Sequence, residues 1–358
     1  MPPDRPQIRS LTALRGVAAF AVLLLHVVAA PLGGAAPAIL SRGDLGVDLF
    51  FYLSGFILAY VYLGDFEGGV ALRPTLQFIG ARLARIYPVH LFVLFFCLPG
   101  LGTSQAFSGT ALVYNLLLMQ GPELPYGSWY GFSWSISAEW HAYLLFPFIV
   151  APLFRCGWRA ASAAAVLSFG LLALSTLPEH GTITATHGVF GLTRVLAEFI
   201  VGMLVYRAFA FGTLPALFRS DGALLATGVL TLLVAASDAP DIVIVGLLPL
   251  FVLFSAVNDG RISRVLGWRP LVYLGEISYS VYMAQVLTRL FQGTIPVTAS
   301  DTALAAAAKI TACMVLTVLF GVGLHRYIEA PCRRLLRTRL EALLARPAWA
   351  RADLRSRR

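Results

Sequence analysis

The chain has 358 residues, of which 58% are hydrophobic and 13% charged, and its formal net charge is +9. About a quarter of the residues of a soluble domain are charged, so this composition, with a mean hydropathy of +0.77, excludes a soluble globular protein and indicates an integral membrane protein. The positive charge is scattered over short loops and a basic tail, which indicates contact with anionic lipid and not nucleic-acid binding.

Ten apolar stretches follow one another along the chain, most of them near the ~20 residues that a membrane-spanning helix needs. We therefore expect an all-α fold, a polytopic membrane helix bundle of about ten transmembrane helices. A further stretch at 106–120 is short and is expected to re-enter the membrane or to lie at its interface. The ten stretches lie near 9–32, 46–63, 81–99, 136–154, 160–177, 190–210, 222–237, 240–257, 270–291 and 304–328.

The charged residues between these stretches predict the topology. If the N-terminus is cytoplasmic, the inner loops and the tail from Arg326 carry nearly all the arginines, while Arg42 stands among acidic residues outside. This is the asymmetry of the positive-inside rule, and it places both termini in the cytoplasm. We expect a membrane-embedded domain over residues 1–340 and a basic cytoplasmic tail over 341–358. A cleavable signal peptide is disfavoured, because the first apolar run is too long for one.

The first apolar stretch contains two ionisable residues, Arg15 and His26. An ionisable side chain at mid-bilayer costs about 2.5 kcal/mol or more, so it marks a functional site. Eleven residues at 100° each place both side chains on one helix face, ~16 Å apart along the axis. We expect a polar stripe that runs deep into the membrane.

Asp48 lies in the first turn of the second stretch. A carboxylate at this position can cap the helix or balance its dipole. Alternatively, a hairpin between the first two helices brings Asp48 close to His26, where it would orient the imidazole and stabilise its protonated form.

Arg82 and Arg85 share a face at the inner mouth of the third stretch. They are either topology anchors or, together with Arg15, ligands of phosphate oxygens, which suit the guanidinium fork. Glu139 lies just inside the fourth stretch, where a carboxylate is buried in a polar cavity or lines one.

Arg194 and Glu198 are four residues apart on one expected helix, which predicts an internal ion pair. The four cysteines have no CxxC spacing, so we expect no zinc site.

Six motifs, in this order, resemble the acyltransferase 3 family of bacterial membrane O-acyltransferases. The resemblance runs from about Ile8 to Arg334, and it departs from the family at Gln285, where the family often has a histidine. The motifs are Arg15 with ten residues before His26, GVDLFFYLSGF at 46–56, RLARIYP at 82–88, SWSISAEW at 133–140, ISYSVY at 277–282 and YIEAP at 327–331.

The resemblance implies transfer of an acyl group, usually acetyl, from cytoplasmic acyl-CoA (acetyl-CoA) to a hydroxyl of a carbohydrate or glycolipid acceptor at the outer side. Arg15, Arg82 and Arg85 match family positions that suit the CoA phosphates, and His26 would be the general base. Asp48 or Glu139 would orient the His26 imidazole. The expected protein is a multi-pass enzyme of the bacterial inner membrane, in contact with membrane lipids, and without a metal or a permanently bound cofactor.

A transporter or flippase of a lipid-linked sugar or an anionic metabolite is the alternative, because polar residues within ten helices would also serve transport. Transporters often show related halves with Gly- or Pro-broken helices in matching places, and the sequence shows no such repeat.

Overall fold

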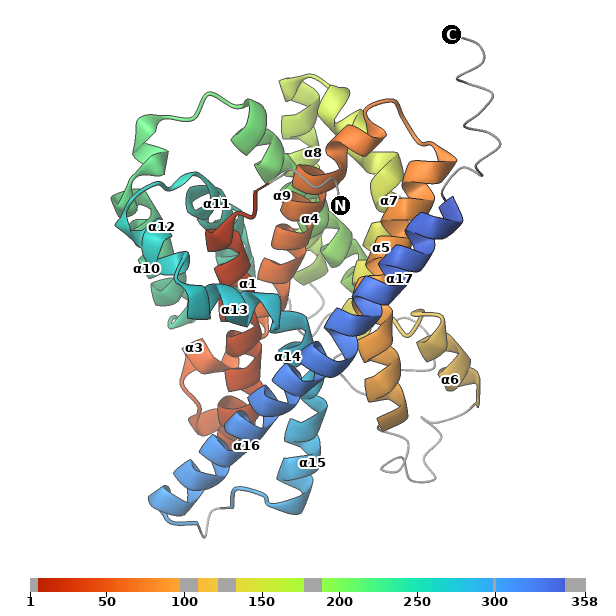
Figure 1. Cartoon of the computed structure of the whole chain (residues 1–358). Coiled ribbons are helices and arrows are strands. Elements are labelled where there is room, and N and C mark those ends of the chain that lie inside the picture. The colour runs from red at the N-terminus through yellow and green to blue at the C-terminus, as the bar shows by residue number, and fades with distance from the viewer. Residues whose placement is uncertain (1–5, 97–108, 122–132, 177–188, 299–300, 345–358) are drawn as a thin grey trace.

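The computed structural model describes residues 6–96, 109–121, 133–176, 189–298 and 301–344. These residues form helices and no strand, which confirms the all-α prediction (Figure 1). Each of the ten apolar stretches corresponds to helical structure in this part of the chain.

Among the described residues, six helical segments are long and apolar enough to cross a membrane. Two further apolar helices, α10 (Asp221–Ala235) and α11 (Asp241–Val257), are shorter, and α9 (Val189–Phe211) carries three charged side chains. The count of ten spans and the cytoplasmic position of the termini remain predictions. The six are α1 with its continuation (Arg9–Leu32), α4 (Leu45–Phe66), α5 (Leu72–Phe96), α7 (Trp134–Arg155), α8 (Trp158–Thr176) and the segment Ala303–Leu344.

Two apolar stretches differ from a simple span. The stretch 270–291 is divided into three short helices, α13 (Arg269–Glu276), α14 (Ser278–Ala284) and α15 (Val286–Thr294). All residues of α14 are buried, so this helix is placed by contacts with protein and not with lipid. The stretch 106–120 contains α6 (Gly109–Leu116), whose eight residues reach ~12 Å and cannot cross a ~30 Å core.

The remaining helices connect or extend these segments. Their bounds are η1 (Leu25–Ala29), α2 (Ala30–Leu32), η2 (Gly33–Ala35), α3 (Ala38–Ser41), η6 (Ala216–Arg219), α10 (Asp221–Ala235), α11 (Asp241–Val257), α12 (Arg261–Leu266), α13 (Arg269–Glu276), α14 (Ser278–Ala284), α15 (Val286–Thr294), α16 (Ala303–Leu324), η7 (His325–Glu329) and α17 (Ala330–Leu344).

Helix α4 lies at the centre of the bundle, against α1, α7, α9 and α11 (Figure 1). Two glycines allow α4 and α9 to approach closely. A Cβ atom on Gly55 would lie 2.0 Å from the carbonyl oxygen of Phe199, and one on Gly202 would lie 2.2 Å from that of Tyr52. Small residues serve this purpose at helix contacts in membranes.

Replacing Gly202 with alanine is expected to destabilise the protein, because the new methyl group must push the two backbones apart. Overpacking typically costs about 1–3 kcal/mol, and the thermal unfolding midpoint in detergent should fall accordingly. Gly170→Ala in α8 is the matched control, since nothing lies within 4 Å of its Cβ position. Equal midpoints for the two variants would contradict close α4–α9 packing.

Helix α17 lies beside α5, and α16, η7 and α17 form one continuous rod (Figure 1). Leu340 of α17 contacts α5 at Gly80, where a Cβ atom would lie 2.4 Å from the leucine Cδ2. Helix α17 runs on into the predicted basic tail as far as Leu344, with Glu341, Ala342 and Leu343 exposed, and residues 345–358 lie outside the described part.

Two segments, η1 and η7, have π-helical geometry inside otherwise α-helical rods. His26 lies in η1 and Glu329 lies in η7. Because π-helical turns inside α-helices occur frequently at functional sites, both residues are candidates for the functional site.

Candidate functional site

An arginine cluster lies inside the bundle, around two carboxylates. The charge of Arg15 interacts with those of Arg85, Glu139 and Glu329. Five helical elements contribute to it, so the predicted grouping of Arg15 with the arginines of α5 is present in the structure. The cluster comprises Arg15 of α1, Arg82 and Arg85 of α5, Glu139 of α7, Glu329 of η7 and Arg333 of α17.

Glu329 links three parts of the fold. It is fully buried, and its carboxylate is paired with Arg85 Nη1. It also accepts a hydrogen bond of 2.6 Å from the Ser280 hydroxyl and lies 3.2 Å from His325 Nδ1. Glu329 therefore positions Arg85, a role that the sequence did not single out although the residue stands in the quoted YIEAP motif.

Arg82 is held against aromatic rings. Its Nη2 donates to the Tyr62 hydroxyl at 3.0 Å, and its guanidinium carbon lies 5.3 Å from the centre of the Tyr62 ring and 5.9 Å from that of Tyr143. Its buried Nε has no hydrogen-bond partner. Arg82 thus presents a donor that a bound anion could use.

Glu139 belongs to the arginine cluster. One carboxylate oxygen accepts hydrogen bonds of 2.6 Å from the hydroxyls of both Ser54 and Tyr143. Its charge acts on Arg15 and Arg82. The expected polar surroundings are present, and the structure places Glu139 beside the arginines. That Glu139 orients His26, the alternative to Asp48, stays a prediction.

His26 is held by two glutamines. Its Nδ1 lies 2.7 Å from Gln285 Oε1, and its backbone carbonyl accepts a 2.7 Å hydrogen bond from Gln292 Nε2. Since an amide oxygen can only accept, Nδ1 carries the hydrogen and Nε2 is the basic nitrogen. Gln285, which contacts the ring here, was noted in the sequence only as a departure from the family.

Asp48 has a different partner from the one expected. Arg194 donates to both of its carboxylate oxygens, at 2.6 to 2.9 Å, and both side chains are buried. Arg194 Nε also lies 3.5 Å from Glu198, so the predicted ion pair is confirmed. The hypothesis that Asp48 orients His26 is not supported, because its carboxylate is engaged by a helix 146 residues further along the chain.

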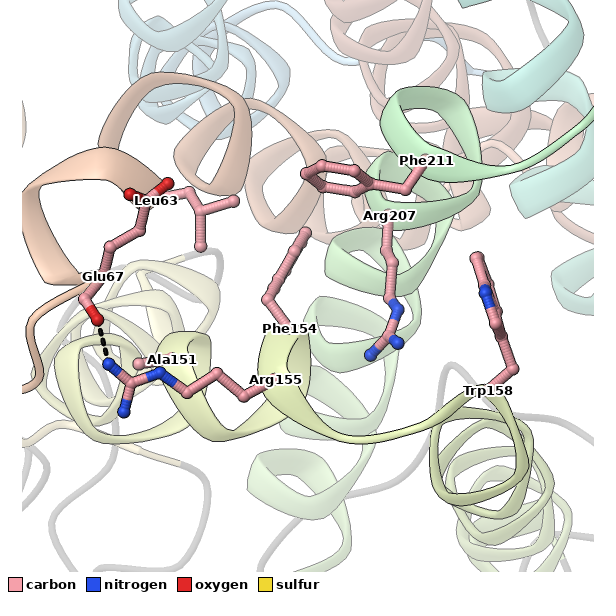
Figure 2. Close-up of a pocket in the computed structure, with 8 residues that line it drawn as sticks. All are labelled: Leu63, Glu67, Ala151, Phe154, Arg155, Trp158, Arg207 and Phe211. Atoms are coloured by element: carbon pink, nitrogen blue, oxygen red, sulfur yellow. Dashed lines mark hydrogen bonds between the residues drawn. The ribbon is translucent and has the colours of Figure 1, made fainter.

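A separate pocket of about 340 Å³ lies where α4, α7 and α9 end and α8 begins (Figure 2). Arg155 donates to the carbonyl oxygen of Glu67, and Arg207 donates to those of Leu153 and Cys156. These carbonyls belong to helix C-terminal turns, where arginine is favourable. The arginines therefore have a structural role at helix ends, and we assign this pocket no part in the reaction.

The sequence of the chain matches a known family of enzymes. Residues 8–326 match the model of the acyltransferase 3 family, described as an acyltransferase domain. The chain belongs to this family, and it is a membrane-embedded transferase. This confirms the resemblance found in the motifs.

Three relatives show where the similarity lies. The chain is 29% identical to the acyltransferase MdmB of Streptomyces mycarofaciens, over 94% of each chain. It is 24% identical to the O-acetyltransferase OatA of Staphylococcus aureus, over 91% of this chain and 58% of OatA. Protein 2 in the picA locus of Rhizobium radiobacter is 39% identical over 107 residues, which are 28% of this chain and 51% of that protein. No solved structure matches the chain.

Proposed function

We propose that this enzyme transfers an acyl group, most simply acetyl, from acyl-CoA to a hydroxyl of a carbohydrate or glycolipid. The donor enters from the cytoplasm of a bacterial cell, and the acceptor is met in the outer half of the inner membrane. The name of OatA, an O-acetyltransferase, supports both the acetyl group and an oxygen acceptor. The family membership argues against the transporter alternative.

The observation that carries this proposal is the charge of the arginine cluster. Four guanidinium groups lie around two carboxylates, the half-buried one of Glu139 and the fully buried one of Glu329. A third carboxylate, Glu276, also acts on Arg333 but is exposed, so that water screens it. The excess of positive charge suits a polyanionic donor, and guanidinium forks match phosphate oxygens.

The distance between the cluster and His26 suits the shape of the donor. Helix α1 is regular from Arg9 to Leu24 and continues directly into η1, which contains His26. At about 1.5 Å per residue, Arg15 and His26 lie ~16 Å apart along the axis. The long and narrow pantetheine arm of CoA can span this distance. His26, with Nε2 as its basic nitrogen, would remove the proton from the acceptor hydroxyl.

A direct assay tests the proposed reaction. The purified protein in detergent is incubated with acetyl-CoA labelled in the acetyl group and with extracted bacterial glycans and glycolipids. Label should appear in an acceptor and be released as acetate by mild alkali, which cleaves an ester. Label that stays on CoA with every acceptor fraction would contradict the proposal.

Arg82→Lys is expected to weaken acyl-CoA binding about 10-fold or more, because lysine keeps the charge but loses the planar fork. A hydrogen bond to a charged group contributes about 1.5–3 kcal/mol, and 1.4 kcal/mol corresponds to a factor of ten. Calorimetric titration with acetyl-CoA measures the dissociation constant. Arg85→Lys should act in the same direction but also disturbs the pair with Glu329, so Arg82 gives the cleaner test.

Arg334→Lys is the matched control for this titration, since Arg334 lies exposed on α17 and donates to the carbonyl of Ala330 in its own helix. It should bind the donor as the unmodified protein does. If Arg82→Lys and the unmodified protein have the same dissociation constant, Arg82 does not bind the donor and has only a role in packing and membrane topology.

A further inference from the structure

We infer that Gln285 is a positioning residue that fixes the tautomer of the His26 imidazole. This inference rests on the proposed function, because it gives His26 the role of general base. It adds the residue that makes that role possible in this chain, and it explains why a buried amide occupies the end of α14.

The contact itself defines the tautomer. Gln285 Oε1 lies 2.7 Å from His26 Nδ1, and since the oxygen can only accept, the hydrogen of the neutral ring is on Nδ1. The lone pair is then on Nε2, on the opposite side of the ring. A base that receives a hydroxyl proton needs this arrangement, and a histidine in the other tautomer could not receive the proton at Nε2.

The local fold holds Gln285 in place. It stands between α14 and α15, where its backbone N–H donates to the carbonyl of Tyr282 at 3.2 Å. Its own carbonyl accepts from the Thr288 hydroxyl at 2.6 Å and from the Thr288 N–H at 3.0 Å. The side chain is completely buried. The break in the apolar stretch 270–291 therefore serves to direct this amide at His26.

The backbone of His26 is held by the same segment. In the π-helical register of η1 a carbonyl accepts from the N–H five residues later, as that of Leu25 accepts from Ala30. For His26 the corresponding residue is Pro31, which has no N–H. Gln292 of α15 supplies the missing donor at 2.7 Å. The segment around α15 thus fixes both the ring and the main chain of His26.

The buried amide nitrogen of Gln285 has no hydrogen-bond partner. Leaving a buried donor unsatisfied is unfavourable, and an unbranched apolar side chain of similar length would avoid it. A glutamine that served only to fill space would be a poor choice here, whereas the oxygen has a defined task. This observation favours a role in positioning over a role in packing.

The test compares Gln285→Met, Gln285→Glu and Gln120→Met in the acetyl-transfer assay. Methionine fills the space but cannot accept from Nδ1, so kcat should fall about 10²-fold, the lower range for loss of general-base catalysis. KM for acetyl-CoA should stay within about 2-fold, since the arginines lie ~16 Å along the helix axis from His26. Glutamate accepts as the amide oxygen does, and at alkaline pH it should restore kcat to within about 10-fold of the unmodified enzyme.

Gln120→Met is the matched control, because Gln120 is also fully buried and donates to the carbonyl of Ser133. A fall in kcat that is the same in both methionine variants would show a general loss of packing and overturn the inference. So would an unchanged kcat in Gln285→Met, or no recovery with glutamate. If the unmodified protein transfers no acetyl group, the proposed function is wrong. This outcome is seen before any variant is made, so it is distinct from a failure of the inference about Gln285.

Imidazole nitrogen resonances supply a readout that does not depend on activity. In protein labelled with ¹⁵N-histidine, the signals that disappear in His26→Gln belong to His26. They should show a hydrogen on Nδ1 in the unmodified protein and a mixture of tautomers in Gln285→Met. A hydrogen on Nε2 in the unmodified protein would overturn the inference.

Discussion

His26→Ala is expected to lower the rate of acyl transfer by 10²–10⁴-fold, the range for removal of a general base. The ring lies half-buried in η1, and its Nδ1 lies 2.7 Å from the amide oxygen of Gln285. The variant should therefore be expressed, inserted and bind acyl-CoA as before. Initial rates with labelled acetyl-CoA, together with the donor dissociation constant, separate the loss of chemistry from a loss of binding.

His141→Ala is the control for this experiment. His141 Nδ1 lies 2.7 Å from the carbonyl of Ser137 in the same helix, and the residue is half-buried like His26. Its replacement should leave the rate close to that of the unmodified enzyme. Near-normal acetylation by His26→Ala, or an equal loss in both variants, would show that the catalytic assignment of His26 is wrong.

Arg194→Met is expected to destabilise the protein by about 3–5 kcal/mol, the usual cost of breaking a buried ion pair by removing one partner. Arg194 is 1% exposed, and Asp48 and Glu198 are both 0% exposed. Without the guanidinium, these two carboxylates must be buried without a cation or take up protons. The thermal unfolding midpoint in detergent should drop sharply, and activity should disappear with the fold.

A triple variant separates this electrostatic cost from a loss of packing. Replacing Asp48 and Glu198 with leucine in the Arg194→Met background removes the two carboxylates that had paired with Arg194, and such replacements often come out neutral in stability. The thermal unfolding midpoint of the triple variant should return most of the way to that of the unmodified protein. If Arg194→Met unfolds like the unmodified protein, or the triple variant is no more stable than the single one, the ion pairs do not stabilise the fold.

Hydropathy predicted the positions of the helices better than their continuity. All ten apolar stretches contain helix, because a lipid-facing segment must be apolar and must satisfy its backbone hydrogen bonds internally. The same criterion could not predict the break at 270–291. The residues there face other helices, so the buried Ser278, Ser280 and Gln285 replace lipid contacts with protein contacts.

The sequence also predicted only part of the candidate site. Arg15, Arg82 and Arg85 could be grouped from sequence, because topology places their helix ends on one side of the membrane. The partners of Asp48 and His26 could not, since they are 146 and 259 residues away. A polar amide at Gln285 within an apolar segment was a usable signal, but periodicity alone cannot tell which neighbouring helix it faces.

The measurement that tests the central proposal most directly uses sealed membrane vesicles of known orientation and acetyl-CoA labelled in the acetyl group. With both termini cytoplasmic, the arginine cluster is reached from the side on which α1 begins, so added donor should be consumed by inside-out vesicles and label should appear in a glycan or glycolipid. Right-side-out vesicles should leave the donor unchanged until they are made permeable. Consumption by sealed right-side-out vesicles alone would contradict the cytoplasmic donor site and the assignment of Arg15, Arg82 and Arg85 to it.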